Sequence, residues 1–308
     1  MSTQHSTQGA LSAIDTANVW LNSEPLTTAG LRGRVVLVDF WTYSCVNWLR
    51  TLPYVRAWDE RYRDRGFVLI GAHAPEFGFE HDLENLRRAT RELGVGYPVV
   101  VDNGYTIWRS FENHYWPAVY LVDRDGEVGF HHFGEGAYEE TERAIQQLLG
   151  IEEEAVRVDA GGVAEAADWE TLGSPETYLG SARGERRSDP RENGLALNHW
   201  ALTGAWSVGG EAAVLDAPAG SIAYRFHARD LHLVMGPAVE GTPVRFRALI
   251  DGQPPGAAHG VDVDDQGHGT VTEQRLHQLI RQPGPITDRT FEITFLDPGV
   301  RAYVFTFG

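Results

Sequence analysis

The stretch VLVDFWTYSCVNWLR, residues 36–50, joins an apolar, β-branched segment to a cysteine and then to helical spacing. Residues 34–41 form a run typical of a strand that is covered on both faces. From residue 46 to 64 apolar side chains recur every three or four positions, which predicts a helix, and Pro53 predicts a kink in it. Cys45, the only cysteine in the chain, therefore lies where a strand ends and a helix begins.

The rest of the first half alternates in the same way. We expect strands at 67–74 and 97–102, helices at 80–93 and 106–111, a β-hairpin formed by 118–123 and 127–134, and an acidic helix that ends near residue 150. This order predicts an α/β domain with a thioredoxin-like mixed sheet flanked by helices, over residues 1–150.

The second half has a different pattern. From about residue 196, eight short alternating runs are separated by glycine, proline and aspartate, which predicts an all-β, jelly-roll-like sandwich. Residues 151–175 are acidic and rich in alanine and glycine, as linkers are. A chain of 308 residues is long enough for two domains, so we predict domains at 1–150 and 176–308 joined by a linker at 151–175.

The charge balance excludes some classes of partner. With 43 acidic and 26 basic residues, the formal net charge of −17 repels phosphate backbones and anionic membranes, so nucleic acid and membrane are not expected partners. No apolar run approaches the roughly 18 residues of a membrane helix, and the N-terminus lacks a secretory pattern. We expect a cytoplasmic protein, or an extracytoplasmic one if a leader or membrane segment has been removed.

The position of Cys45 has a chemical consequence. The unpaired N–H groups and the positive end of the dipole at the first turn of a helix favour a thiolate over a thiol. A thiolate is the form that attacks peroxides and disulfides. The alternative is that Cys45 is only a small buried apolar side chain, which is common for a free cysteine. Position alone leaves both interpretations open.

Several motifs together resemble a known family. VDFW, with Asp39 six residues before Cys45, and the later Trp116-Pro117-Ala118-Val119 resemble the active-site segments of thioredoxins. WTYSC (41–45), HAPEF (73–77) and the C-terminal LDPGVRAYVFTFG resemble the DipZ-type proteins. The resemblance extends from about residue 11 to 308. It implies a TlpA-like or redoxin (AhpC/TSA-like) thioredoxin domain followed by a carbohydrate-module-like β-sandwich.

The resemblance also implies roles for individual residues. Cys45 matches the nucleophilic first cysteine of the family's C-x-x-C motif, and Asp39 matches the buried acid that moves protons beneath it. Pro117 matches the cis-proline that faces the cysteine and receives the substrate. Trp48 stands where dithiol relatives carry the second, resolving cysteine. The chain therefore lacks the internal thiol with which a dithiol oxidoreductase releases its mixed disulfide.

A second resemblance concerns the peroxiredoxins, which carry a threonine three residues before the peroxide-reacting cysteine and a proline seven residues before it. Thr42 matches the threonine, whereas Val38 occupies the position of the proline. The partial match implies that the Thr42 hydroxyl holds a peroxide oxygen or stabilises the charge that develops at Cys45.

We therefore expect a one-cysteine redox protein that needs no cofactor. The predicted catalytic residues are Cys45, Thr42 and Asp39, and the residues predicted to shape the substrate groove are Tyr43, Trp48, Trp116 and Pro117. The thiolate would reduce a peroxide or a disulfide, and an external low-molecular-weight thiol or a redox partner protein would complete the cycle. One alternative is a catalytically silent binding protein whose groove holds a peptide or whose sandwich holds a carbohydrate. Another is a homodimer joined through Cys45.

Other residues in the first half support weaker hypotheses. A metal site is suggested by His114, Asp123, Asp125, His131 and His132. Adjacent histidines on a strand point to opposite faces, however, so solvent-facing hairpin residues are the favoured interpretation. His73 and Glu76 are expected either at the rim of the active site or in a turn around Pro75.

Two motifs in the second half suggest ligand sites, but each also has a structural interpretation. Asp262, Asp264 and Asp265 resemble a calcium loop, but the glutamate at its twelfth position is absent, so we favour a turn between strands. Trp200 and Trp206 suggest a sugar-stacking platform, but aromatic residues at strand starts more often belong to a core. No metal is predicted.

Overall fold

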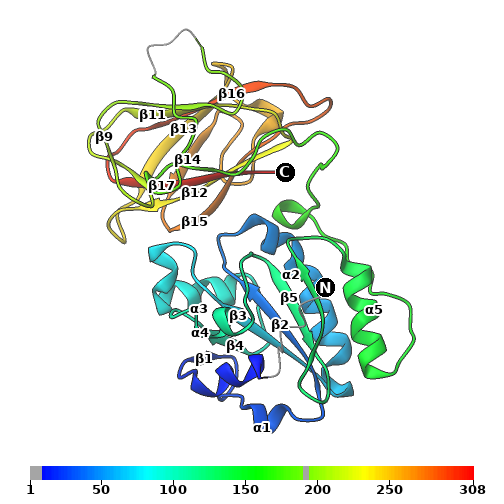
Figure 1. Cartoon of the computed structure of the whole chain (residues 1–308). Helices are drawn as coiled ribbons and strands as arrows, with labels where there is room; N and C mark the ends of the chain where they lie inside the picture. Colours follow the sequence, from blue (N-terminus) through cyan, green and yellow to red (C-terminus); the bar gives the residue numbers. More distant parts are fainter. Residues whose placement is uncertain (1–8, 190–193) are drawn as a thin grey trace, which may run out of the picture. The chain divides into compact units, whose positions relative to one another are not determined.

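The chain folds into two compact units, Met1–Ala164 and Glu165–Gly308 (Figure 1). The computed structural model describes residues 9–189 and 194–308. None of the helices within these ranges combines the length and the apolar character that crossing a bilayer requires. The domain limits given above, at 150 and 176, stay a prediction.

The first unit is built around a six-stranded mixed sheet with the order β1-β4-β3-β2-β5-β6. Its strands are β1 (Trp20–Leu21), β2 (Val35–Trp41), β3 (Phe67–His73), β4 (Val99–Val101), β5 (Ala118–Val122) and β6 (Val128–Phe133). The central strands β2, β3 and β4 run parallel, whereas β5 and β6 form the antiparallel hairpin expected from the sequence. Every residue of β2 is buried, in agreement with its apolar run.

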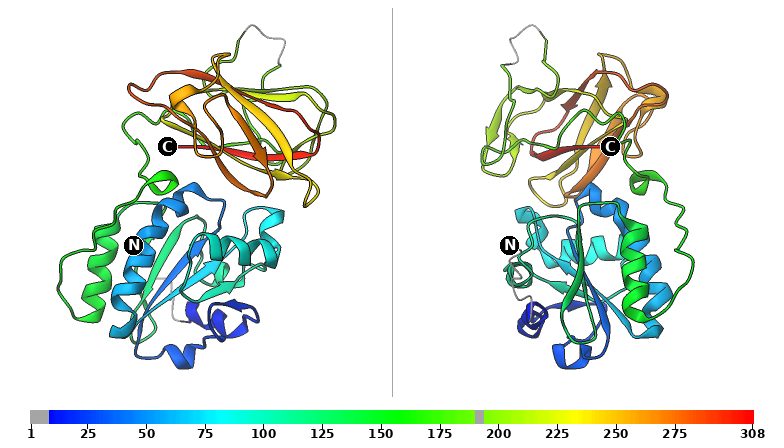
Figure 2. Two further views of the ribbon diagram at one scale, coloured as in Figure 1. Left: turned by 180° about the vertical axis from the view of Figure 1, so that it is seen from behind. Right: turned by 45° about the vertical axis from the view of Figure 1, so that its right-hand side comes forward.

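Helices cover both faces of this sheet (Figures 1 and 2). They are α1 (Thr28–Leu31), α2 (Val46–Tyr62), α3 (Leu83–Glu92), α4 (Thr106–Ser110) and α5 (Tyr138–Leu149). α2 packs against α5, with Tyr54 stacked on Tyr138 at 3.7 Å between ring centroids. Side chains of β2 alternate, so Phe40 packs with residues of α4, whereas Asp39 and Trp41 face α2.

The helix after β3 begins later than the sequence predicts. Instead of starting at residue 80, α3 starts at Leu83, because the Asp82 carboxylate accepts from the N–H groups of Glu84 and Asn85 and caps the helix. Gly78–His81 form a separate 3-10 turn. Glu80 therefore lies outside the helix, where it is fully buried.

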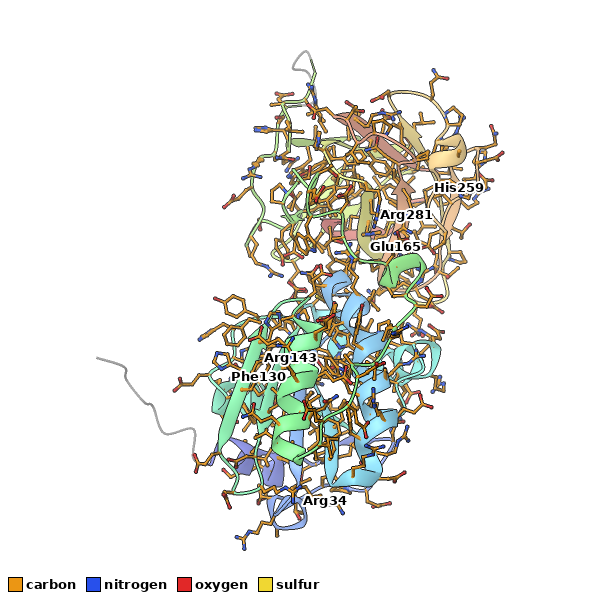
Figure 3. The ribbon with its side chains drawn as sticks, turned by 90° about the vertical axis from the view of Figure 1, so that its right-hand side faces the viewer. Arg34, Phe130, Arg143, Glu165, His259 and Arg281 are labelled. Atoms are coloured by element: carbon orange, nitrogen blue, oxygen red, sulfur yellow. The ribbon has the colours of Figure 1, made fainter. Side chains whose placement is uncertain are left out.

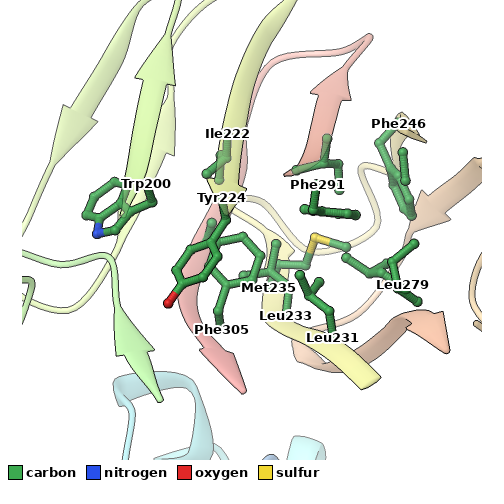
Figure 4. Packing of buried hydrophobic residues seen from close by; sticks show 14 of the residues in the cluster. Trp200, Ile222, Tyr224, Leu231, Leu233, Met235, Phe246, Leu279, Phe291 and Phe305 are labelled. Atoms are coloured by element: carbon green, nitrogen blue, oxygen red, sulfur yellow. The ribbon is translucent and has the colours of Figure 1, made fainter. Parts of the chain in front are cut away.

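The second unit is a β-sandwich of two antiparallel sheets (Figure 2). One sheet contains β7 (Thr177–Tyr178), β9 (Trp206–Val208), β10 (Ala213–Leu215), β12 (Asp230–Pro237), β15 (Arg275–Arg281) and β17 (Val300–Phe307). The other contains β8 (Trp200–Thr203), β11 (Gly220–Phe226), β13 (Val244–Ile250), β14 (His268–Val271) and β16 (Arg289–Phe295). Apolar side chains of both sheets meet in one core, which Figure 4 shows from close by.

One of the eight alternating runs expected from the sequence, residues 269–280, forms parts of two strands. β14 pairs with β13 in one sheet, whereas β15 pairs with β12 in the other. The chain therefore crosses between the sheets within a few residues. Periodicity alone misses this crossing, because both strands alternate in the same way on either side of it.

An ion cluster lies close to the first residue of the second unit. Glu165 accepts from Arg229 at 3.3 Å and from Arg281 at 2.6 Å, and both arginines also bind the buried Asp230. Glu165 and Arg281 are labelled in Figure 3. Because Asp230 belongs to β12, these ion pairs fasten the start of the unit to the sandwich.

Candidate active site

Cys45 is the N-cap residue of α2, directly after the β2–α2 connection. Its backbone is extended, and its carbonyl accepts from the N–H group of Leu49 at 3.0 Å. The side chain is partly exposed, and Sγ lies 3.8 Å from the carbonyl oxygen of Trp116. Trp116 precedes Pro117 in a cis peptide bond. The thiol thus meets the loop before β5, where the resemblance to thioredoxins places a substrate.

Trp48 forms a hydrogen bond with a buried acid of β2, Asp39. Its indole N–H donates to Oδ2 of Asp39 at 2.9 Å. The indole also stacks on Trp41, with ring centroids 4.2 Å apart. Burial raises the pKa of Asp39 to about 7, although the bond from Trp48 lowers it. The residue at the position of a resolving cysteine is therefore a fixed partner of the carboxyl that would serve that cysteine.

The structure does not place all four predicted groove residues at the surface. Trp48 is fully buried and Tyr43 is 5% exposed, so neither presents a face to a substrate here. Trp48 packs between β2 and α2, and the ring of Tyr43 stacks on that of His73 with centroids 5.9 Å apart. Trp116 is half-buried, and its indole donates to the carbonyl of Ala74 at 3.0 Å. The roles of Trp116 and Pro117 in substrate binding stay predictions.

Thr42 is also enclosed, together with its neighbour Ser44. Both hydroxyls lie at the buried carboxylate of Glu80: Ser44 Oγ donates to it at 2.6 Å, and Thr42 contributes to lowering its pKa. Burial outweighs the effect of both hydroxyls and raises the pKa of Glu80 to about 7. Glu80 was not predicted as a site residue from the sequence. The signal available was an acidic residue beside Phe79 in a loop that is otherwise largely apolar.

His73 lies inside the protein and not at a rim. It is fully buried, packs edge-on against Trp41 at 5.0 Å, and is neutral at physiological pH because burial lowers its pKa to about 3. Glu76 is partly exposed, and its backbone N–H donates to Glu80 at 2.6 Å. The turn interpretation of this segment is therefore the one that the structure supports.

The hairpin contains four of the remaining polar candidates of the first unit, Asp123, Asp125, His131 and His132, whereas His114 is exposed and lies before β5. His131 is exposed and stacks on Tyr120, whereas His132 is bound to the carbonyl of Glu135, so the two rings point to opposite faces as expected. The Asp123 carboxylate accepts from N–H groups within the turn. These contacts agree with a structural role in the hairpin.

In the second unit the favoured structural interpretations are confirmed. Asp264 accepts from the N–H groups of Gln266 and His268 in a turn before β14, and Asp262 binds Arg275 at 2.6 Å. Trp200 is 1% exposed, so it belongs to the core and presents no platform for a sugar. Trp206 is partly buried and packs edge-on against Phe295.

The chain is similar to several known proteins. Residues 174–308 match a family described as the thioredoxin like C-terminal domain. The DipZ proteins of Mycobacterium bovis and Mycobacterium tuberculosis are 33% identical over 306 residues, which cover 94% of this chain and 41% of each DipZ protein. The thiol-disulfide oxidoreductase YkuV of Bacillus subtilis is 25% identical over 130 residues, covering 42% of this chain and 87% of YkuV. The solution structure of a thioredoxin-like protein in the oxidised form is 26% identical, with a TM-score of 0.40, and covers 44% of this chain and 91% of that chain.

The first unit is a thioredoxin-like domain whose helix α2 begins at a single cysteine, and the second is a β-sandwich. The chain is DipZ-like: it is homologous to the DipZ proteins over nearly its whole length and spans 41% of theirs. The sequence prediction of a DipZ-like thioredoxin-superfamily protein with a C-terminal sandwich is thereby confirmed.

The buried carboxyl of Asp39 predicts how stability depends on pH. Because its pKa is raised from 3.8 to about 7, the folded state binds a proton that the unfolded state has lost, and stability falls as pH rises through 7. Between pH 5 and 8 the free energy of unfolding of the wild type should fall by about 2–3 kcal/mol more than that of D39N, whose amide oxygen still accepts from Trp48. The free energy of unfolding can be measured by urea titration at both pH values, with hydrogen-exchange mass spectrometry of peptides covering residues 35–62 as the readout. Equal pH dependence in both proteins would contradict the assignment.

Proposed function

We propose that this chain is a one-cysteine thiol redox protein in which Cys45 is the nucleophile. The observation that carries the proposal is the placement of Cys45: partly exposed, at the N-terminus of a 17-residue helix, and facing the Trp116 carbonyl beside Pro117. The helix terminus stabilises the thiolate, and the Trp116–Pro117 segment supplies backbone against which an extended peptide can lie. The relationship to YkuV, a named thiol-disulfide oxidoreductase, supports this class of chemistry.

The cycle requires a thiol from outside the chain. With a disulfide substrate, the Cys45 thiolate forms a bond to one sulfur and the other sulfur leaves as a thiolate. With a peroxide, the thiolate takes the terminal oxygen to become a sulfenic acid, the alcohol leaves, and an external thiol then forms a mixed disulfide with release of water. A second external thiol frees Cys45. Trp48 occupies the position from which an internal thiol would do this.

A glutathione reaction tests the proposal. Native protein incubated with oxidised glutathione at pH 7 should gain one glutathionyl group at Cys45, several-fold faster than urea-unfolded protein, because the native thiol is more ionised. The adduct should persist until an external thiol is added. C45S should gain none. A parallel incubation with hydrogen peroxide and dimedone detects the sulfenic acid. Slower reaction of the native thiol than of the unfolded one would contradict the proposal.

One observation favours the second candidate, a binding protein with a silent thiol. Next to Pro117, Tyr115 is 54% exposed and Phe133 is 40% exposed, with ring centroids 5.1 Å apart. Exposed aromatic rings of this kind suit a peptide or a redox partner protein. C45S separates the two functions, since a binding protein keeps its peptide affinity without the thiol, whereas mixed-disulfide formation is lost.

A further inference from the structure

The carboxylate of Glu80 holds together the two segments that surround the nucleophile. Its Oε1 accepts from Ser44 Oγ at 2.6 Å, and Ser44 directly precedes Cys45. Its Oε2 accepts from the backbone N–H groups of Glu76 at 2.6 Å and Phe77 at 3.0 Å, in the segment that follows β3. Through three hydrogen bonds, this one buried side chain therefore joins the segment between β2 and α2 to the loop that follows β3.

The surroundings of Glu80 bring the titration of its carboxyl close to neutral pH. The Ser44 and Thr42 hydroxyls face it from the β2–α2 connection, and Glu76, four residues earlier, adds a repulsive carboxylate. His73, at the end of β3, is kept neutral because burial lowers its pKa to about 3. Burial is the largest effect on Glu80 and raises its pKa to about 7. Near that pH the residue alternates between a neutral acid and a buried anion.

We propose that Glu80 is the positioning residue of the Cys45 thiol. Through Ser44 it fixes the segment that delivers Cys45 to the N-terminus of α2, and its charge sets how readily the thiolate forms there. The inference rests on the proposed function, because it matters only if the thiolate is the reactive form. It adds a residue that neither the C-x-x-W sequence nor the cis-proline segment indicates.

The direction of the effect follows from the charges. Cys45 directly follows Ser44, which is hydrogen-bonded to Glu80. An ionised Glu80 therefore opposes a second negative charge on Cys45 and raises the pKa of the thiol. A protonated Glu80 keeps its bonds without this repulsion. As pH rises from 6 to 8, the wild-type thiolate population should therefore increase less steeply than for a single isolated thiol. The link through Ser44 acts at every pH, since it depends on geometry.

The pH dependence of Cys45 alkylation by iodoacetamide, measured by mass spectrometry on the full chain, tests the proposal. E80Q is isosteric: its amide oxygen can accept from the two backbone N–H groups and its amide N–H can donate to Ser44 Oγ. We expect E80Q to lose the inflection near pH 7 and to show an apparent thiol pKa lower by about half to one unit. At pH 8 it should therefore react faster than wild type, by up to about threefold for a wild-type thiol pKa near 8.5. S44A retains the charge of Glu80 but not the link, and should react more slowly at every pH with the inflection kept.

E84Q is the matched control, because it removes a carboxylate with an exposed side chain, 77% accessible, from the start of α3. It should reproduce the wild-type profile. Identical profiles for wild type and E80Q would overturn the electrostatic part of the proposal, and wild-type rates in S44A would overturn the positioning part even if E80Q fails to fold. A wild-type thiol that stays unreactive until the protein is unfolded contradicts the proposed function instead, so the two failures are distinguishable.

Discussion

W48C is expected to convert the one-cysteine site into one that turns over by itself. Position 48 is the third residue of α2, and residues three apart at a helix start have Cβ atoms about 5–6 Å apart, within reach of a disulfide after small adjustments. Asp39, now bound by the indole of Trp48, would face the new thiol and accept its proton. Reduction of insulin disulfides by W48C in the presence of dithiothreitol should rise well above the wild-type rate.

The same substitution should lower stability. Trp48 is fully buried and stacked on Trp41, and removing a large core side chain costs about 3–5 kcal/mol. A disulfide that closes so short a loop returns about 2 kcal/mol. Oxidised W48C should therefore be less stable than wild type but more stable than its reduced form. This comparison needs only unfolding curves with and without reductant.

W48A is the matched control, since it leaves the same cavity without a thiol. It should share the loss of stability and show no gain in insulin reduction. If W48C and W48A are equally inactive although W48C carries a 45–48 disulfide, the missing thiol is not what limits this site. A two-dalton mass decrease on oxidation establishes whether the bond has formed.

R50M should destabilise the first unit by about 3–5 kcal/mol at pH 8, because it leaves a buried carboxylate without its cation. Arg50 Nη1 lies 2.9 Å from Oε1 of Glu135, and the two side chains are 2% and 6% exposed. Burial already raises the pKa of Glu135, although Arg50 lowers it. Without Arg50 that pKa rises further, so the loss should be smaller at pH 5, where Glu135 takes up a proton.

The double variant R50M/E135Q is the control for the ion pair. Replacing both partners removes the unpaired charge, so most of the lost stability should return. A urea titration followed by hydrogen-exchange mass spectrometry of peptides from α2 reports on unfolding of the first unit alone. A loss below 1 kcal/mol in R50M at pH 8 would show that the pair adds little to the folded state.

Local sequence was enough for most of the first unit. The apolar run of β2, the helical spacing of α2 and the hairpin of β5 and β6 all follow from patterns of a few residues, and the structure shows them where expected. The predicted start of α3 at residue 80 was wrong. The helical pattern of the sequence continues back to that residue, but the Asp82 side chain caps the helix and it begins at Leu83. In the sandwich, the change of sheet between β14 and β15 was missed for the same kind of reason. Periodicity reports which side chains alternate and does not report their partner strand.

The sequence by itself determined that this chain has one thiol, at a strand-to-helix junction, and the proposed redox cycle therefore needs a second thiol from outside these 308 residues. Only the tertiary structure decided what surrounds that thiol. It placed Trp48 beneath the surface as the partner of Asp39, and it brought Glu80 to Ser44 across 36 residues of sequence. Burial in a folded core raises the pKa of both acids to about 7, and burial comes from contacts between segments that lie far apart along the chain.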